Sequence, residues 1–141
     1  MVINILIADD DSDEVDFVQS CVQCVADDAA VEIDVAVAFT AERAVEAVRM
    51  KQFDVVVLDV VFSYRGLSGL YVAEVVWRYS AAAGVLIRGN YAGGCSAQEL
   101  AYLRAKMPPG GQLYAVAKSA DEDELVRICQ RMIDSKIAVH G

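Results

Sequence analysis

The feature that most constrains the fold of this chain is a strict alternation of short apolar runs with longer segments of helical periodicity. The runs predict strands at residues 2–8, 32–39, 54–60, 84–89 and 112–117, and the first of them, apolar at nearly every position, is typical of a strand buried on both faces. In the segments between them apolar residues recur at helical spacing, as at Val15, Val18, Val22 and Val25. Five βα units predict an α/β fold: a doubly wound five-stranded parallel sheet with right-handed crossovers.

Capping signals predict where the helices begin. Thr40 is a suitable N-cap for the second helix, and a loop at residues 62–68 leads into a third helix at about residues 69–82. For the first, fourth and fifth helices, pairs with the spacing of a capping box occur at Asp11 and Glu14, Ser96 and Glu99, and Ser119 and Glu122.

Length and composition predict one globular domain. The 141 residues suffice for one hydrophobic core, which we expect at about residues 2–134, followed by a short tail at 135–141. A hydrophobic fraction of 56% excludes a disordered chain. No apolar run approaches the ~20 residues that span a bilayer, and the N-terminus lacks the basic start of a signal peptide. We therefore expect a cytoplasmic protein.

The net charge of −9, from 21 acidic and 12 basic residues, restricts the classes of partner. Nucleic-acid binding requires a basic surface that neutralises phosphates, and the chain has no block rich in Lys and Arg for phosphates or for an anionic membrane. We therefore expect no direct contact with nucleic acid or membrane. The excess of carboxylates favours protein partners or a bound cation.

Cys21 and Cys24 form a C-x-x-C motif, which is compatible with half of a zinc site or with a redox pair. The chain has no second such motif, and its only histidine is His140 near the C-terminus. The motif also lies within a helical pattern. We therefore interpret all four cysteines, including Cys95 and Cys129, as small buried hydrophobic residues.

Charged residues follow the first, third and fifth predicted strands. Asp9, Asp10 and Asp11 come after the first strand, Asp59 lies at the end of the third, and Lys118 follows the fifth. Ligand sites of parallel α/β sheets lie at the carboxyl ends of the strands, so these side chains should converge. Clustered carboxylates raise one another's pKa unless a cation neutralises them, and Mg²⁺ prefers such ligands. An aspartate beside Mg²⁺ can attack a phosphoryl donor, while a lysine stabilises the added charge.

Each of these signals is weak when taken alone. An acidic residue after a strand is commonly a helix N-cap, and we expect Asp11 to be one. Lys118 alone is compatible with a solvated loop lysine. Asp59 is harder to explain without a function, because a carboxylate that ends so apolar a strand must be solvated, paired or bound to a metal. The joint placement of these residues is what predicts a site.

Three motifs make the chain resemble the receiver domains of two-component response regulators: ILIADDD at residues 5–11, VVVLDV at 55–60 and VAKS at 116–119. The resemblance covers nearly the whole chain and implies the strand order 2-1-3-4-5. It also implies that Asp59 is the phosphoacceptor and that Lys118 contacts the phosphoryl oxygens.

The resemblance further implies a Mg²⁺ cofactor and a set of partners. Asp10, Asp59 and the backbone carbonyl of Val61 would ligate the ion directly, and Asp9 would act mainly through water. A histidine kinase or a phosphotransfer protein would donate the phosphoryl group, and a downstream protein would receive the signal. The chain would then be a signalling phosphoacceptor and not an enzyme. The surface implied for a homodimer is the fourth helix, fifth strand and fifth helix, although the sequence does not indicate whether the chain dimerises.

The fourth strand departs from the family pattern in the residues that transmit the signal. Receivers usually carry Thr or Ser at the end of this strand, where the chain has Gly89 followed by Asn90. Gly89 offers no hydroxyl to a phosphoryl group, so we expect Asn90 to be the substitute donor, with Arg88 second. Arg88 stands in a strand that should be buried. It either reaches the acidic site or extends to solvent, and we slightly favour solvent.

The fifth strand and the loop after Asp59 depart as well. The aromatic residue usually found three positions before the lysine is replaced by Ala115, and strand alternation points the adjacent Tyr114 to the opposite face. The loop after Asp59 is about two residues longer than usual. The acceptor residues therefore match the family, whereas the residues of signal transmission do not.

Three functions are compatible with these residues. The first is a phosphorylatable single-domain receiver that acts by binding a partner. The second is a degenerate receiver that acts as a phosphorylation-independent adaptor, which Gly89 and Ala115 favour. The third, a phosphatase resembling haloacid dehalogenases, is prompted by the pair Asp9 and Asp11. That family requires an acidic pair after a late strand, where this chain has Lys118 and Ser119.

Overall fold

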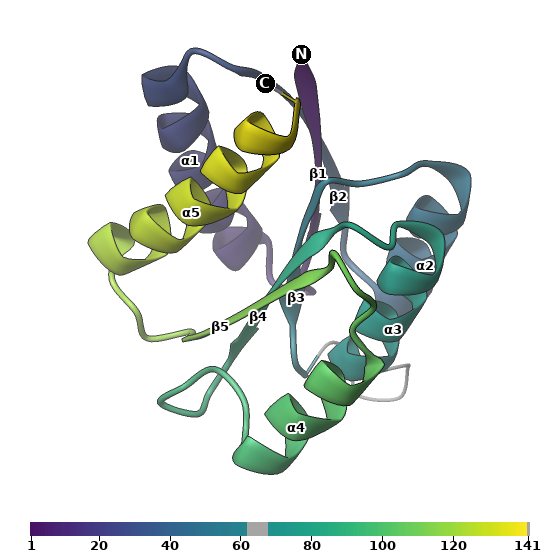
Figure 1. Cartoon of the computed structure of the whole chain (residues 1–141). Helices are drawn as coiled ribbons and strands as arrows, with labels where there is room; N and C mark the ends of the chain where they lie inside the picture. Colours follow the sequence, from purple (N-terminus) through teal and green to yellow (C-terminus); the bar gives the residue numbers. More distant parts are fainter. Residues whose placement is uncertain (62–67, 141) are drawn as a thin grey trace.

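A computed structural model, which describes residues 1–61 and 68–140, confirms the predicted α/β fold (Figure 1). In these residues strands and helices alternate in the order β1 (Val2–Ala8), α1 (Ser12–Ala29), β2 (Glu32–Ala38), α2 (Ala41–Met50), β3 (Val55–Asp59), α3 (Gly69–Tyr79), β4 (Gly84–Gly89), α4 (Ala97–Lys106), β5 (Gln112–Ala117) and α5 (Glu122–His140). The sheet order is β2-β1-β3-β4-β5, and all neighbouring strands are parallel.

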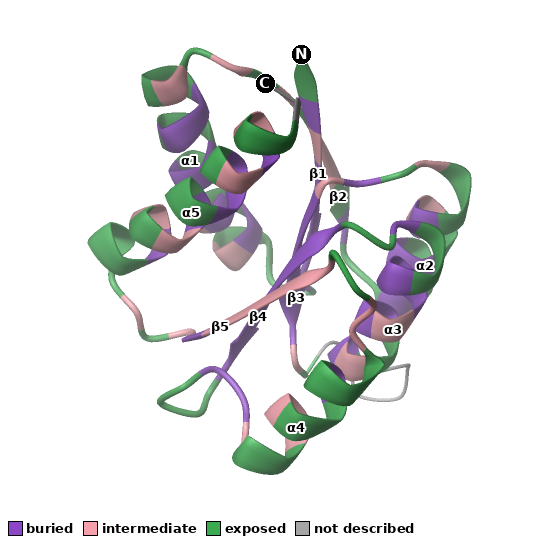
Figure 2. Cartoon of the chain, viewed as in Figure 1, coloured by how far each residue is buried: buried purple, intermediate pink, exposed green. Residues whose placement is uncertain are grey.

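Helices cover both faces of the sheet. α1 and α5 lie on one face, and α2, α3 and α4 lie on the other (Figure 1). Alternate strand residues point into the two layers, so that Val55 and Val57 pack beneath α1 and α5, whereas Val56 and Leu58 pack beneath α2 and α3. β3 and β4 are buried throughout, while the edge strand β5 is only partly covered (Figure 2).

Three of the predicted helix starts are confirmed by hydrogen bonds at the N-caps. Asp11 and Thr40 each accept a backbone N–H from the first turn of their helix. Ser96 and Glu99 form the predicted capping box, with both of its hydrogen bonds present. These side chains satisfy backbone donors that a helix cannot satisfy by itself, which fixes the entry of the chain into each helix.

The predicted capping box of α5 is wrong. The helix begins at Glu122, and the carboxylate of Asp121, not the hydroxyl of Ser119, accepts an N–H of the first turn at 2.9 Å. A turn closed by the hydrogen bond from the Ala120 N–H to the Ala117 carbonyl carries the chain past Ser119 before the helix starts.

The stretch expected as a tail, residues 135–141, is helical as far as His140. Lys136 is buried and donates a hydrogen bond to the carbonyl of Ala82, and Ile137 packs against the core beneath α1 and α5. These contacts hold the last turns of α5 on the sheet.

α3 ends at Tyr79, earlier than expected, because the chain turns at Ser80, whose hydroxyl accepts the N–H of Phe53.

Two further findings bear on the predictions from composition. The four cysteines are free; Cys21, Cys95 and Cys129 are buried as expected, but Cys24 is exposed. Among the helices of the described residues, none has the length and apolar character needed to cross a membrane.

The predicted loop at 62–68 lies, apart from Ser68, outside the described residues.

Candidate functional site

The predicted acidic residues meet at the carboxyl ends of β1 and β3. Asp9 and Asp10 follow β1, and Asp59 is the last residue of β3. One carboxylate oxygen from each of the three lies within 4.8 Å of the others. Asp9 and Asp59 are each 4% exposed, whereas Asp10 is exposed. The cluster is therefore buried on the side of the sheet and meets solvent at Asp10.

Lys118 reaches this cluster from the end of β5. Its Nζ lies 2.9 Å from Oδ2 of Asp59 and 3.5 Å from Oδ2 of Asp9. Its backbone N–H donates to the carbonyl of Gly89 at 2.8 Å, which ties the end of β5 to the end of β4. The structure thus brings together Asp9, Asp10, Asp59 and Lys118, four of the five charged residues that follow the first, third and fifth strands.

The second oxygen of each buried aspartate is held by a backbone N–H. Oδ1 of Asp9 accepts from Asp11 at 3.0 Å, and Oδ1 of Asp59 accepts from Val61 at 3.1 Å. Asp11 itself is the N-cap of α1, as expected, and not a member of the cluster. Both buried carboxylates are therefore fixed in orientation, with one oxygen toward the backbone and the other toward Lys118.

Burial dominates the electrostatics of the site. It is the main reason that the pKa of Asp9 rises from 3.8 to about 6; the N–H of Asp11 opposes the rise, and the charge of Asp59 adds to it. Burial also raises the pKa of Asp59, against the hydrogen bond from Lys118. For Lys118, burial alone would lower the pKa, but the hydrogen bond and charge of Asp59 and the charge of Asp9 outweigh it and raise the pKa. One ammonium group thus pairs with both buried carboxylates of the cluster.

These residues fit a hard divalent cation. Carboxylate oxygens are the ligands that Mg²⁺ prefers, and the exposed side at Asp10 gives access to the waters that Mg²⁺ retains. A cation would also offset the repulsion and the burial that raise the pKa of Asp9 and Asp59. Asp9, Asp10 and Asp59 can therefore hold a metal ion.

The end of β4, where a Thr or Ser is expected from the resemblance, is closed by the chain's own backbone. A Cβ at Gly89 would overlap the carbonyl oxygen of Gly94 and lie 3.1 Å from Cγ2 of Val60. Gly94 has a φ of +89°, and a Cβ there would overlap the backbone of Val116. The segment after β4 therefore folds back over β4 and β5 and occupies the space that a larger side chain at position 89 would need.

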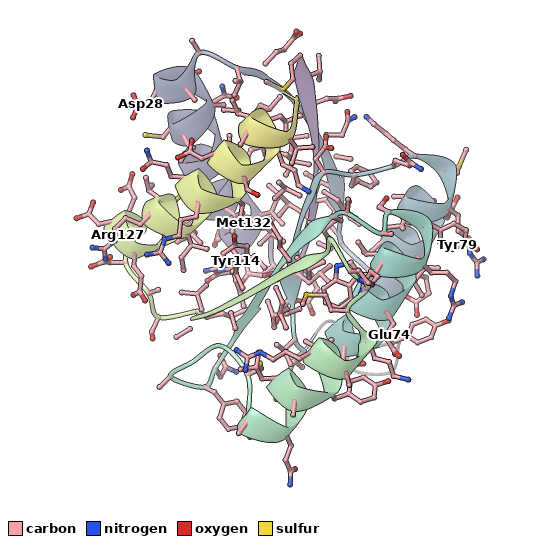
Figure 3. The ribbon with its side chains drawn as sticks, viewed as in Figure 1. Asp28, Glu74, Tyr79, Tyr114, Arg127 and Met132 are labelled. Atoms are coloured by element: carbon pink, nitrogen blue, oxygen red, sulfur yellow. The ribbon has the colours of Figure 1, made fainter. Side chains whose placement is uncertain are left out.

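The remaining residues of the expected switch lie on different sides. Ala115 packs against the core beneath α2, α3 and α4, whereas Tyr114 packs on the opposite face near Met132 (Figure 3). This confirms that Tyr114 points to the opposite face from Ala115, as strand alternation predicts. Asn90 is exposed just beyond the end of β4.

Arg88 does not extend to solvent, contrary to the slight preference drawn from the sequence. It is 2% exposed, and its Nη2 lies 2.9 Å from Oε2 of Glu14 in the first turn of α1. Its Cζ also lies 5.7 Å from the centroid of the Phe17 ring. Glu14 is the residue that sequence reasoning missed. The signal was an arginine in an otherwise apolar strand, because a buried charge requires a partner.

Comparison with known proteins gives a match in structure but not in sequence. The sequence matches no protein-family model, and it matches no curated protein. A response-regulator receiver domain protein from Methanospirillum hungatei JF-1 aligns with a TM-score of 0.73 and 16% identity over 98% of this chain and 99% of that chain. The receiver domain of a Francisella response regulator aligns with a TM-score of 0.70 and 20% identity over 94% and 98% of the two chains.

A response regulator from Burkholderia pseudomallei, solved with a phosphorylated aspartic acid, a calcium ion and citrate, aligns with a TM-score of 0.64 and 15% identity over 99% of this chain and 75% of that chain. At such identities the likeness shows the fold. This chain therefore has the fold of a response-regulator receiver domain, and it carries an acidic cluster and a lysine at the carboxyl edge of the sheet.

Proposed function

We propose that this chain is a phosphoacceptor of two-component signalling that takes up a phosphoryl group on Asp59. The observation that carries the proposal is the position of the Lys118 ammonium, 2.9 Å from Asp59 and 3.5 Å from Asp9. A structural ion pair would need one carboxylate, whereas this lysine stands beside a cluster of three. The phosphorylated aspartic acid of the Burkholderia protein, which has a similar fold, supports the same chemistry here.

In the proposed reaction an oxygen of Asp59 attacks the phosphorus of the donor. The bond from phosphorus to the donor breaks, the donor leaves with that electron pair, and an acyl phosphate forms on Asp59. Lys118 would bond the phosphoryl oxygens and balance their charge. Asp10, Asp59 and the carbonyl of Val61 would hold Mg²⁺, with Asp9 acting mainly through water, and the bound ion would supply positive charge to the phosphoryl oxygens.

The proposed donor is a histidine kinase or a phosphotransfer protein in the cytoplasm, and the output is the binding of a downstream protein. The partly covered edge strand β5 (Figure 2) supports α4, β5 and α5 as the surface for such contacts, including a homodimer. The chain would act as a signalling phosphoacceptor, with no reaction beyond its own phosphorylation and dephosphorylation.

Intact-mass analysis after incubation with acetyl phosphate tests the proposal. With Mg²⁺ the wild type should gain one phosphoryl group, without Mg²⁺ it should gain little, and Asp59→Asn should gain none. Acetate is the leaving group in this reaction. A modified Asp59→Asn protein, or a wild type inert both to acetyl phosphate and to kinases, would refute phosphorylation on Asp59.

A second candidate function, that of a phosphorylation-independent adaptor, is favoured by the closed end of β4. The backbone of Gly94 fills the space beside Gly89 through which a switch residue would move. Position 115 is Ala, so it has no aromatic side chain that could change position in response. An adaptor would bind its partner equally well with and without acetyl phosphate and Mg²⁺. A phosphoacceptor with signalling output would bind it differently.

A further inference from the structure

A second cation, Arg88, lies next to the acceptor site on the same face of the sheet. In the register of β3 and β4 it is opposite Asp59, and in the register of β4 and β5 it is opposite Val116, two residues before Lys118. Paired residues of parallel strands point to the same face, so these side chains share the layer beneath α1 and α5. Arg88 is thus a neighbour of the acceptor site, although its own partner is Glu14.

The burial of Arg88 is costly and incompletely compensated. The side chain is 2% exposed, and its Nε and Nη1 are buried without a hydrogen-bond partner among the described residues. Only Nη2 reaches a carboxylate, Oε2 of Glu14 at 2.9 Å, and this ion pair lacks the geometry of a hydrogen bond, so Oε2 is unsatisfied as well. An apolar residue of similar size would fill this position at a lower cost, since a buried ion pair often stabilises a fold less than well-packed hydrophobic groups do. The charge of Arg88 therefore requires a reason other than packing.

That reason lies in the surroundings of Lys118. Glu14 stands in the first turn of α1, and its negative charge acts on Lys118 together with the charges of Asp59 and Asp9. Glu14 is 30% exposed and has a flexible side chain, so without a partner it would compete with Asp59 for the ammonium group. The guanidinium of Arg88, 2.9 Å from Glu14, offsets the charge of this carboxylate and attracts it toward β4.

We propose that Arg88 is a positioning residue for the acceptor site. By pairing with Glu14 it keeps this carboxylate from binding Lys118, so that Lys118 stays paired with Asp59 and Asp9. The inference rests on the proposed function, because the lysine that it positions is the one expected to bond the phosphoryl group. Arg88 itself touches no reacting atom.

Side-chain variants can test this without moving the strands. The backbone carbonyl of Arg88 accepts the N–H of Val60 at 2.9 Å, and that of Gly89 accepts the N–H of Lys118 at 2.8 Å. These bonds do not depend on the side chain at position 88. Arg88→Met keeps an unbranched apolar stem and removes the charge, Arg88→Lys keeps a charge, and Glu14→Gln removes the competing carboxylate.

The experiment measures the rate at which Asp59 is phosphorylated by acetyl phosphate with Mg²⁺, followed by intact mass. Arg88→Met should be slower than wild type by roughly five-fold, a coupling of about 1 kcal/mol. The double variant Arg88→Met/Glu14→Gln should return to within about two-fold of wild type, and Arg88→Lys should retain most of the rate. Arg127→Met, which removes an exposed arginine from α5 (Figure 3), is the matched control and should leave the rate unchanged.

Salt distinguishes a positioning role of Arg88 from a long-range attraction of the anionic acetyl phosphate by the charge of Arg88. A field effect should fade at ~1 M salt, where the Debye length is about 3 Å, whereas a defect in the buried site should persist. Thermal melts show whether each variant is folded, and Arg88→Gln replaces Arg88→Met if the latter is not.

The outcomes distinguish this inference from the proposed function. A reactive wild type with an unchanged Arg88→Met rate would overturn the positioning role alone, and so would a double variant as slow as Arg88→Met or a defect abolished by salt. If acetyl phosphate does not modify the wild type, the same rates are measured with a histidine kinase as the donor. A wild type inert to both donors would overturn the proposed function and the positioning role with it.

Discussion

Without divalent cations, the stability of this protein should fall as the pH rises through the range set by Asp9. Its pKa is about 6 in the folded protein, against 3.8 as the ordinary value. The folded state therefore binds the proton more tightly than the unfolded state, so the stabilisation is complete below pH 3.8 and is lost as the pH rises through about 6. The difference in pKa corresponds to at most about 3 kcal/mol, and partial screening by solvent reduces it.

About 1 kcal/mol of this loss should fall between about pH 5 and about pH 7, because much of the titration of Asp9 lies there. Urea unfolding in EDTA at these two pH values measures it, and saturating Mg²⁺ should flatten the dependence by stabilising the charged form. Asp9→Asn keeps an oxygen that can accept the N–H of Asp11 but removes the titration, so its stability should vary less with pH. Asp16→Asn, which changes an exposed residue of α1, should behave as wild type.

Two results would refute this reasoning. If Asp9→Asn lost as much stability as wild type, the loss would come from Asp59 or from the overall charge of −9 and not from Asp9. If metal-free wild type were equally stable at both pH values, the burial of Asp9 would not raise its pKa in solution. Asp59, whose pKa is raised by burial as well, contributes in the same direction.

Four further changes test other parts of the structure. Mg²⁺ should raise the melting temperature of wild type more than that of Asp10→Ala. At a Mg²⁺ concentration of a hundred times Kd, wild type should gain about 2.7 kcal/mol in the free energy of unfolding, and equal gains in both proteins would argue against a metal site. Gly89→Thr should lower the free energy of unfolding by about 2 kcal/mol or more because its Cβ overlaps a backbone carbonyl, whereas Gly93→Ala, with open space around it, should not. Asn90→Ala should weaken the amide shift changes that beryllofluoride causes in β4 and β5, and a full response would remove Asn90 from the mechanism. Asp121→Ala should cost about 1 kcal/mol through the lost cap of α5, and unchanged urea unfolding would contradict that assignment.

Strand positions and the main site residues could be predicted because both follow from local patterns. The apolar runs of β1, β4 and β5 end where the structure ends these strands. For the central strands β1 and β4 the reason is burial, since a strand covered on both faces tolerates few polar residues. Asp9, Asp59 and Lys118 stand at such ends, so the parallel arrangement alone places them at one edge of the sheet.

The contacts that could not be predicted depend on how elements pack together or on the path of a turn. Glu14 has the spacing of a capping-box residue, and this local explanation concealed its pairing with Arg88, which depends on how α1 packs on β4. The choice of Asp121 over Ser119 as the cap of α5 depends on the turn after β5. The role of Gly94 depends on its distance from β5, which no sequence pattern reports.

The interlocked glycines at the end of β4 have an evolutionary consequence. Because the backbone of Gly94 fills the space beside Gly89, a lineage with this arrangement cannot acquire a hydroxyl-bearing residue at position 89 by one substitution without first rebuilding the loop. The two positions are thus epistatic, and the order of mutations matters. Related sequences should gain or lose these glycines together, with changes in loop length preceding the appearance of Thr or Ser.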